Sequence, residues 1–291
     1  MHLLRIQHKT VYRYRSPVNI GPHRLMLRPR ESRELRLISA ELTIMPAAVM
    51  TWAHDVYGNT VATANFQAKS DVLQIDSVAE IELNTDPWPV FDIAARAIQF
   101  PFQYSDDELT DLGALLIQQY PDYADRLRIW AHNFVRGEST DTLSLLKDLS
   151  SGIAQWIGYE IRGDEGTQSP TLTLELGRGA CRDFAVLFVE AVRCLGFGGR
   201  IVSGYLYNRG RAVSVGNTGR GATHAWAEVY VPGAGWISFD PTNRNVGGFN
   251  LIPVAVARNI DQAMPVSGTF GGTADAFESM SVYVEVAESP G

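Results

Sequence analysis

The spacing of apolar residues along the chain changes near residue 97. Before this point, apolar and polar residues alternate over 38–44 and 79–83, which is the pattern of a half-buried strand. The sequence Tyr57-Gly58-Asn59 favours a turn between two further strands. Because several short strands separated by turns are typical of a small sandwich, we predict an N-terminal β-sandwich domain over residues 1–97.

Beyond residue 97 the apolar spacing first becomes helical. Residues 125–135 carry apolar side chains three and four positions apart, which predicts a helix. A second helix with the same spacing ends at Trp156, and Thr140 or Asp141 can cap its start. A third helix with the same spacing is predicted from Cys181 onward, and Gly196 marks its end. This part of the chain is therefore expected to contribute helices with one buried face.

The apolar spacing then returns to a period of two. It predicts consecutive antiparallel strands over 201–207, 222–231 and 236–240, with a hairpin turn at 232–235 between the last two. The Gly-rich tail carries one more strand, at 281–286. These elements predict a second domain over residues 98–291, with helices packed on an antiparallel sheet and a C-terminal strand extension. The expected fold class is α+β.

Composition limits the classes of function. The chain has 291 residues, of which 45% are hydrophobic and 20% charged, as in a globular protein. Its net charge of −7 argues against nucleic acid as a partner, and no apolar run is long enough to span a membrane. Residues 1–8 show no secretory signal, so we expect a cytoplasmic protein unless a longer precursor carries one. Oligomeric state is left open. Four arginines favour a solvated loop or strand edge, with a local anion site as the alternative: Arg28, Arg30, Arg33 and Arg36.

The two cysteines have different expected roles. Cys181 opens the third helix, where unpaired backbone N–H groups and the helix dipole favour a thiolate, so it is a candidate nucleophile. Asp183 opposes this effect, and a buried packing role is the alternative. Cys194 is expected to be a packed core thiol. The two lie 13 positions apart on one helix, about 20 Å, and therefore cannot form a disulfide.

The predicted strands place candidate partners near Cys181. His224, Trp226 and Glu228 share one face of their strand, because side chains alternate. A four-residue hairpin loop at 232–235 would set Val231 opposite Trp236 and Asp240 opposite about Ala227. In that register Asp240 and His224 are only loosely matched, although a bulge or a shifted pairing would bring them together.

Three segments resemble the transglutaminase-like superfamily of papain-like thiol enzymes, in particular bacterial members with an N-terminal β-domain. They are Gly179-Ala180-Cys181-Arg182-Asp183-Phe184-Ala185, His224-Ala225-Trp226-Ala227-Glu228-Val229-Tyr230 and Gly235-Trp236-Ile237-Ser238-Phe239-Asp240-Pro241-Thr242-Asn243. The resemblance implies a papain-like transglutaminase core in which Cys181 is the nucleophile, His224 the base and Asp240 the third member of a triad. It also implies that the fold brings these three together. Arg182 departs from the pattern, since many relatives carry Gln there.

The implied reaction is acyl transfer on a peptide or protein substrate. The thiolate would attack an amide carbonyl, and water or an amine would resolve the thioester, as in a cysteine protease, an amidase or a transglutaminase. The backbone N–H of Cys181 is the first candidate oxyanion donor and Gln168 the second, with an ordinary loop amide as the alternative for Gln168. Trp226 and Trp236 are candidate walls of a substrate groove, with a core role as the alternative.

No cofactor or metal is expected. The chain shows no CxxC or HxxxH spacing and no calcium loop of the EF-hand type. The competing hypothesis is a non-enzymatic binding or assembly module that reuses the same scaffold. The complete Cys–His–Asp set argues against that hypothesis, because a scaffold has no need of it.

Overall fold

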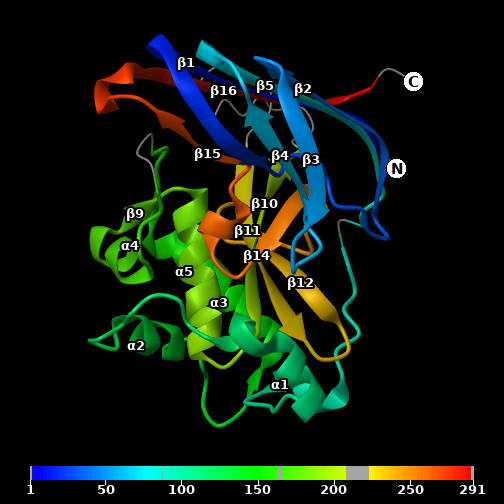
Figure 1. Ribbon diagram of the computed structural model, residues 1–291. Helices are drawn as coiled ribbons and strands as arrows, with labels where there is room; N and C mark the ends of the chain where they lie inside the picture. The colour runs from blue at the N-terminus through cyan, green and yellow to red at the C-terminus, as the bar shows by residue number, and fades with distance from the viewer. Residues whose placement is uncertain (1, 87, 163–165, 208–222, 290–291) are drawn as a thin grey trace.

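The computed structural model describes residues 2–86, 88–162, 166–207 and 223–289. Within them, an N-terminal antiparallel sheet lies over a core of helices and a second sheet (Figure 1), so the α+β prediction is confirmed. The first sheet has seven strands, ordered β2-β5-β1-β4-β3, with β15 and β16 also paired to β1. Its strands are β1 (His2–Leu25), β2 (Leu35–Met45), β3 (Ala48–His54), β4 (Thr60–Phe66), β5 (Lys69–Leu83), β15 (Val266–Gly271) and β16 (Phe277–Glu288).

The predicted sandwich is one bent sheet, carried by the 24-residue strand β1. The first half of β1 pairs with β5 and β16, and its last residues pair with β4 and β15. The register shifts between Arg13 and Val18, where the strand changes partners. Both halves enclose one apolar cluster that includes Tyr14, Leu25 and Leu73. The strands expected at 38–44 and 79–83 and the turn at 57–59 are confirmed within β2, β5 and the β3–β4 connection.

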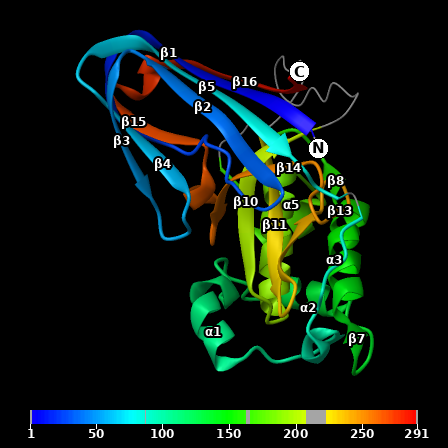
Figure 2. The same cartoon turned by 90° about the vertical axis from the view of Figure 1, so that its right-hand side faces the viewer.

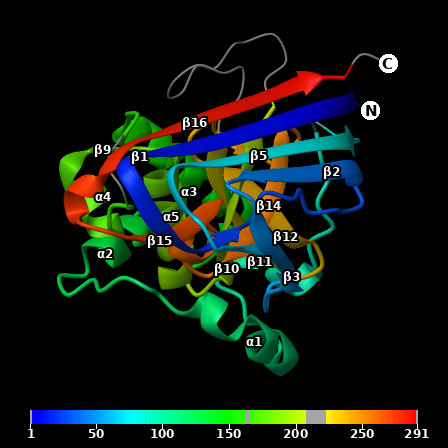
Figure 3. The same ribbon diagram turned by 45° about the horizontal axis from the view of Figure 1, so that its top comes forward.

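The end of the chain returns to its beginning. The predicted strand at 281–286 lies within β16, which pairs with β1 from Leu4 to Tyr14. Figure 3 shows β16, β1, β5 and β2 side by side above the core. The C-terminal extension therefore completes the N-terminal sheet. The domain boundary at residue 97 stays a prediction.

The core is a five-stranded antiparallel sheet with helices on one face (Figure 2). Its strands, in spatial order, are β13 (Asn245–Val246), β12 (Gly235–Asp240), β11 (Thr223–Val231), β10 (Gly199–Leu206) and β14 (Leu251–Ala257). The helices are α1 (Asp106–Leu112), α2 (Arg126–His132), α3 (Thr142–Trp156), α4 (Pro170–Leu176) and α5 (Cys181–Cys194). The shortest strands are β6 (Gln99–Phe100), β7 (Thr140–Asp141), β8 (Gly158–Tyr159) and β9 (Arg178–Gly179).

The three helices predicted from spacing are present. Helix α3 is capped by the Asp141 side chain, which accepts a hydrogen bond from the Ser144 N–H at 2.7 Å. Helix α2 ends at His132, three residues earlier than expected. Of the predicted strand 222–231, residue 222 lies outside the described residues. No helix among the described residues is both long and apolar enough to cross a membrane.

The two faces of the core sheet have different partners. Ala225, Ala227 and Val229 of β11 pack with α3 and α5 in one cluster. On the opposite face, Trp226 of β11 packs with Tyr57, which comes from the connection between β3 and β4 of the N-terminal sheet. Both layers thus hold β11, which carries His224.

The hairpin between β11 and β12 is one residue tighter than predicted. Val231 pairs with Gly235 and Ala227 with Phe239, which leaves a three-residue loop. Gly235 follows the turn with a φ of +73°, in the left-handed region that glycine favours. The expected pairing of Val231 with Trp236 is therefore wrong by one position. Because a shift of one residue exchanges the faces of a strand, the observed register moves Asp240 to the face of His224.

Candidate active site

Cys181 is the first residue of α5. The preceding residue, Ala180, is the N-cap of the helix and has no side-chain acceptor. The first backbone N–H groups of α5, at the end of the helix that carries the thiol, therefore receive no hydrogen bond from the N-cap side chain. Strand β8 runs parallel to β9 just before Cys181, pairing Tyr159 with Gly179. This pairing fixes the approach of the chain to the helix. Cys181 is only partly buried.

The surroundings of Cys181 favour its thiolate. Burial by itself would raise the pKa of the thiol, but the hydrogen bond and charge of the His224 side chain outweigh it. The backbone N–H of Ala225 also lowers the pKa of Cys181, whereas the charge of Asp240 raises it. The net direction is a lowered pKa. In contrast, burial and nearby carboxylates raise the pKa of Cys194 to about 12.

His224 and Asp240 form a buried pair. The Nε2 atom of His224 lies 2.8 Å from Oδ2 of Asp240, and the side chains are 6% and 0% exposed. A carboxylate only accepts hydrogen bonds, so Nε2 carries a proton and Nδ1 is the nitrogen left for the thiol. Burial opposes charge on His224, but the Asp240 charge and the contact with Cys181 raise its pKa above the ordinary value. The pKa of Asp240 is lowered despite burial, chiefly by the charge of His224.

Asn243 supports this pair, and sequence reasoning gave it no role. Its Nδ2 donates to Oδ2 of Asp240 at 2.7 Å and lies 3.4 Å from Nε2 of His224. The backbone N–H groups of Thr242 and Asn243 donate to the other carboxylate oxygen, at 3.0 and 3.3 Å. The turn after β12 therefore satisfies a fully buried carboxylate. In the sequence, the segment Asp240-Pro241-Thr242-Asn243 was the feature that could have indicated this role of Asn243.

Asp183 organises the start of α5 through contacts that the sequence did not reveal. Its carboxylate accepts two hydrogen bonds from Arg162, at 2.9 and 2.8 Å. It also accepts from the backbone N–H groups of Gln168 and Ala180, both at 2.8 Å. The Asp183 side chain is fully buried, and the Arg162 side chain is 13% exposed. The negative charge expected to oppose the Cys181 thiolate is therefore matched by the Arg162 guanidinium.

The same contacts place Gln168 beside the start of α5. The side chain is 7% exposed, and its Oε1 accepts a hydrogen bond from the Thr173 hydroxyl at 3.0 Å. This contact leaves the Nε2 amide group as the free donor end; within the described part of the chain, it has no hydrogen-bond acceptor. Of the loop at 162–169 that carries Gln168, residues 163–165 lie outside the described residues. The oxyanion role of Gln168 stays a prediction.

The two tryptophans do not line a groove at Cys181. Trp226 is 1% exposed, so it belongs to the core and not to a surface wall. Trp236 pairs with Tyr230 at the other end of β11, about 20 Å from His224 at about 3.3 Å per residue. The Arg200 guanidinium lies over the Trp236 ring, with its Cζ atom 4.1 Å from the ring centroid. Glu228, which shares its strand face with Trp226, pairs with the same Arg200 at 2.7 Å.

Tyr159 is a further neighbour of the site that the sequence did not single out. Tyr159 is 44% exposed, and its ring meets Phe184 of α5 edge-on, with 6.1 Å between the ring centroids. Burial, then the charge of Cys181, raise the pKa of Tyr159 to about 12. Tyr159 therefore borders the thiol from the side of β8. Among the described residues, no group of three His, Cys, Asp or Glu side chains is arranged to hold a metal ion.

Comparisons with known proteins identify the family of the chain. Residues 128–241 match the family model of the Transglutaminase-like superfamily, and residues 4–82 match that of the Bacterial transglutaminase-like N-terminal region. An uncharacterized protein of Mycobacterium tuberculosis is 28% identical over 281 residues, which cover 92% of this chain and 87% of the relative. One of Mycobacterium leprae is 27% identical over 273 residues, 94% of each chain.

A solved structure shares the fold over the whole length. A protein of Cytophaga hutchinsonii, described as a "Putative Cysteine Protease", superposes with a TM-score of 0.73 at 18% identity. The match covers 99% of this chain and 92% of that chain. The two family models together show that the chain belongs to the transglutaminase-like superfamily and carries the N-terminal region of its bacterial members, and the solved structure shares its fold. At the level of the family, the chain therefore has the fold of the transglutaminase-like thiol enzymes.

Proposed function

We propose that this protein catalyses thiol-dependent acyl transfer or hydrolysis at amide or peptide bonds of a peptide or protein substrate. Cys181 would be the nucleophile, His224 the acid–base group and Asp240 the group that orients the imidazole. The observation that carries the proposal is the coupling of a thiol at a helix start to a buried His–Asp pair. That coupling lowers the pKa of Cys181 and raises that of His224.

The proposed reaction has two halves. The Cys181 thiolate forms a bond to the amide carbonyl carbon, and the carbonyl electron pair moves to oxygen. When the tetrahedral intermediate collapses, the carbon–nitrogen bond breaks, and Nδ1 of the His224 imidazolium gives its proton to the leaving amine. A thioester remains. Neutral His224 then takes a proton from water or from a primary amine as that nucleophile attacks, and the thiolate departs. Water yields a carboxylic acid, and an amine yields a new amide.

The oxyanion of the tetrahedral intermediate needs donors near the thiol. The backbone N–H of Cys181 lies in the first turn of α5, where the helix supplies no acceptor. The side-chain amide of Gln168 is the second donor that we propose. Its Nε2 group is held by the bond between Oε1 and Thr173, and its backbone is held by Asp183. Asp183 thus anchors the backbone at both donors, because it also accepts a hydrogen bond from Ala180, the residue before Cys181.

A substrate experiment tests the proposal. The protein is incubated with a library of blocked glutamine- and asparagine-containing peptides, with and without a primary amine, and the released ammonia, cleaved peptides and new amides are measured by mass spectrometry. We expect product formation that Cys181→Ala abolishes without loss of the fold. A wild-type rate equal to that of Cys181→Ala on every substrate supports the alternative, a non-enzymatic binding or assembly module. The two acceptors then separate hydrolysis from transamidation.

A further inference from the structure

Trp226 packs directly behind His224. The two residues lie two positions apart on β11, and their rings are nearly parallel, with 6.0 Å between centroids and 26° between planes. A cation over the face of an indole at this distance is stabilised by the ring quadrupole. The arrangement therefore favours the imidazolium form of His224 and restricts rotation of its ring. Asp240 holds the edge of the imidazole, whereas Trp226 holds its face.

The place of Trp226 is set by a cluster on the face of the sheet away from α5. The indole is 1% exposed and packs with Val202, Leu206, Leu251 and Val256 of β10 and β14. The remaining partner of this cluster is Tyr57, which comes from the turn between β3 and β4. The N-terminal sheet thus contributes an aromatic ring to the packing behind the candidate base.

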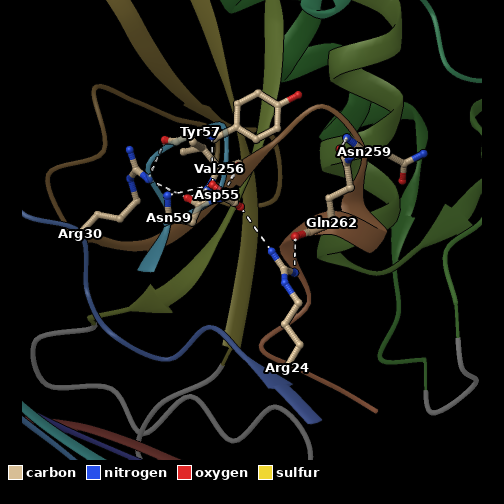
Figure 4. Close-up of polar contacts among 8 residues, drawn as sticks. All are labelled: Arg24, Arg30, Asp55, Tyr57, Asn59, Val256, Asn259 and Gln262. Atoms are coloured by element: carbon tan, nitrogen blue, oxygen red, sulfur yellow. Dashed lines mark hydrogen bonds and ion pairs between the residues drawn. The ribbon is translucent and has the colours of Figure 1, made fainter. Parts of the chain in front are cut away.

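The turn that carries Tyr57 is tied to the core sheet by a buried amide. Asn59 is fully buried; its Nδ2 donates to the Val256 carbonyl at 2.7 Å and its Oδ1 accepts from the Val256 N–H at 2.9 Å. Arg30 donates to the same Oδ1 at 2.6 Å, and to the Tyr57 carbonyl at 3.2 Å. Figure 4 shows these side chains gathered around Val256. The amide of Asn59 therefore pairs with β14 as a neighbouring strand would.

Asp55 closes the turn from the other side. Its Oδ1 accepts from the N–H groups of Tyr57 and Asn59, at 2.9 and 3.0 Å, and its Oδ2 pairs with Arg24 at 3.3 Å. Arg24 also donates to the Gln262 carbonyl at 3.1 Å (Figure 4). A turn fixed at both ends and docked through buried hydrogen bonds is rigid. It is suited to hold a ring in place.

We propose that Trp226 is a positioning residue for the His224 imidazolium, and that the turn 55–59 of the N-terminal sheet holds Trp226 in that place. The proposal rests on the proposed function, because it assumes that His224 is the acid–base group. It gives the N-terminal region a definite role in the reaction chemistry. The part of the turn that acts is the Tyr57 ring, and Asn59 and Asp55 keep it seated.

Other titratable groups lie near the His224 imidazole. Cys181 approaches from α5 and Asp240 from β12, and both raise the pKa of His224. Tyr159 of β8 interacts electrostatically with Cys181 and Asp240. These titratable groups come from α5, β12 and β8, and not from β11, the strand that carries Trp226. Substitution of Trp226 therefore changes one contact of His224 and leaves its charged neighbours in place.

The test is an NMR titration of the His224 imidazole, whose signal is assigned with His224→Asn. In the wild type we expect the midpoint to lie above the ordinary histidine value. Trp226→Leu keeps an apolar side chain but removes the aromatic face, and we expect it to lower the midpoint by about one pH unit. Trp226→Phe retains a ring and restores most of the shift. Tyr57→Ala lowers the midpoint by less, and Tyr57→Phe leaves it unchanged.

Val56 supplies the matched control for the turn, because it lies beside Tyr57 and is 94% exposed. Val56→Ala is expected to leave the midpoint unchanged. Circular dichroism checks the fold of each variant. If Trp226→Leu fails to fold, the comparison of Tyr57→Ala with Tyr57→Phe tests the inference instead. A raised wild-type midpoint that none of these variants moves overturns the inference and leaves the proposed function standing. A wild-type midpoint at the ordinary histidine value counts against the proposed function itself.

Discussion

Asp240 Oδ2 lies 2.8 Å from His224 Nε2, and neither side chain is appreciably exposed to solvent. The pair spans two strands whose register sequence reasoning misplaced by one residue. With Val231 opposite Gly235, Asp240 falls on the same face as His224 and completes its hydrogen bonds through Thr242 and Asn243. The proposed chemistry depends on this relationship.

Removing the Asp240 side chain is expected to separate its two effects. Asp240→Ala leaves Nε2 of His224 without an acceptor, and we expect a loss of turnover on the order of 10³–10⁴. Asp240→Asn keeps an oxygen that can hold the ring but removes the charge that raises the pKa of His224. Asp240→Asn should therefore lose less turnover than Asp240→Ala. Steady-state rates measure the order; equal losses in the two variants would show that orientation contributes nothing.

Gln168 can be tested apart from the thiol. If its amide stabilises the oxyanion, Gln168→Ala lowers kcat by about 10²–10³. The alkylation rate of Cys181 should stay the same, because alkylation forms no oxyanion. Gln155, an exposed glutamine of α3, is the matched control. An unchanged kcat in Gln168→Ala would return Gln168 to the role of an ordinary loop amide.

The buried ion pair between Arg162 and Asp183 makes a prediction about stability. Asp183→Asn removes the charge that matches Arg162 and weakens its bonds to the Gln168 and Ala180 N–H groups. We expect the free energy of unfolding to fall by about 3 kcal/mol, measured by urea denaturation. The exposed pair of Arg128 with Asp125 is the comparison, and Asp125→Asn should leave the denaturation midpoint nearly unchanged.

His8 predicts a loss of stability in acid. It is 2% exposed, and its ring nitrogens lie 3.0 Å from the Tyr205 hydroxyl and 3.1 Å from that of Thr10. Burial lowers the pKa of His8 to about 4. As pH falls from the unfolded value near 6.5 toward 4, the unfolded chain binds a proton that the folded chain does not.

This proton uptake should reduce the free energy of unfolding by about 3 kcal/mol across that interval. Urea denaturation at a series of pH values measures it, and His8→Gln should flatten the dependence. His132, which is exposed on α2, supplies the control substitution His132→Gln. If His8→Gln and the wild type lose stability in parallel, His8 is not the group responsible.

Local patterns predicted the elements that carry the site. The apolar face of α5 and the alternation of β11 and β12 are properties of neighbouring residues, so the positions of Cys181, His224 and Asp240 on a helix start and two strands followed directly. The register did not follow, because it depends on the loop conformation. Gly235 adopts a left-handed φ and shortens the hairpin by one residue, which alternation alone does not reveal.

Local sequence patterns could not predict contacts between segments that are far apart in the chain. Arg162 and Asp183 are 21 positions apart, and Asn59 and Val256 are 197 apart. Nothing in the local pattern at 57–59 distinguishes an exposed turn from one docked on the core. The length of β1 was also hidden, because Pro17, Gly21 and Pro22 interrupt its alternation while the bent strand continues through them.

The central claim, a working thiolate–imidazolium pair, is tested most directly by the pH dependence of Cys181 alkylation with iodoacetamide. Cys194 serves as an internal reference, because burial raises its pKa to about 12 and it should stay unlabelled at neutral pH. We predict single labelling at Cys181, with a rate that persists well below the ordinary thiol pKa and falls in His224→Ala. A Cys181 rate that rises only near the ordinary thiol pKa, and does not change in His224→Ala, would contradict the account.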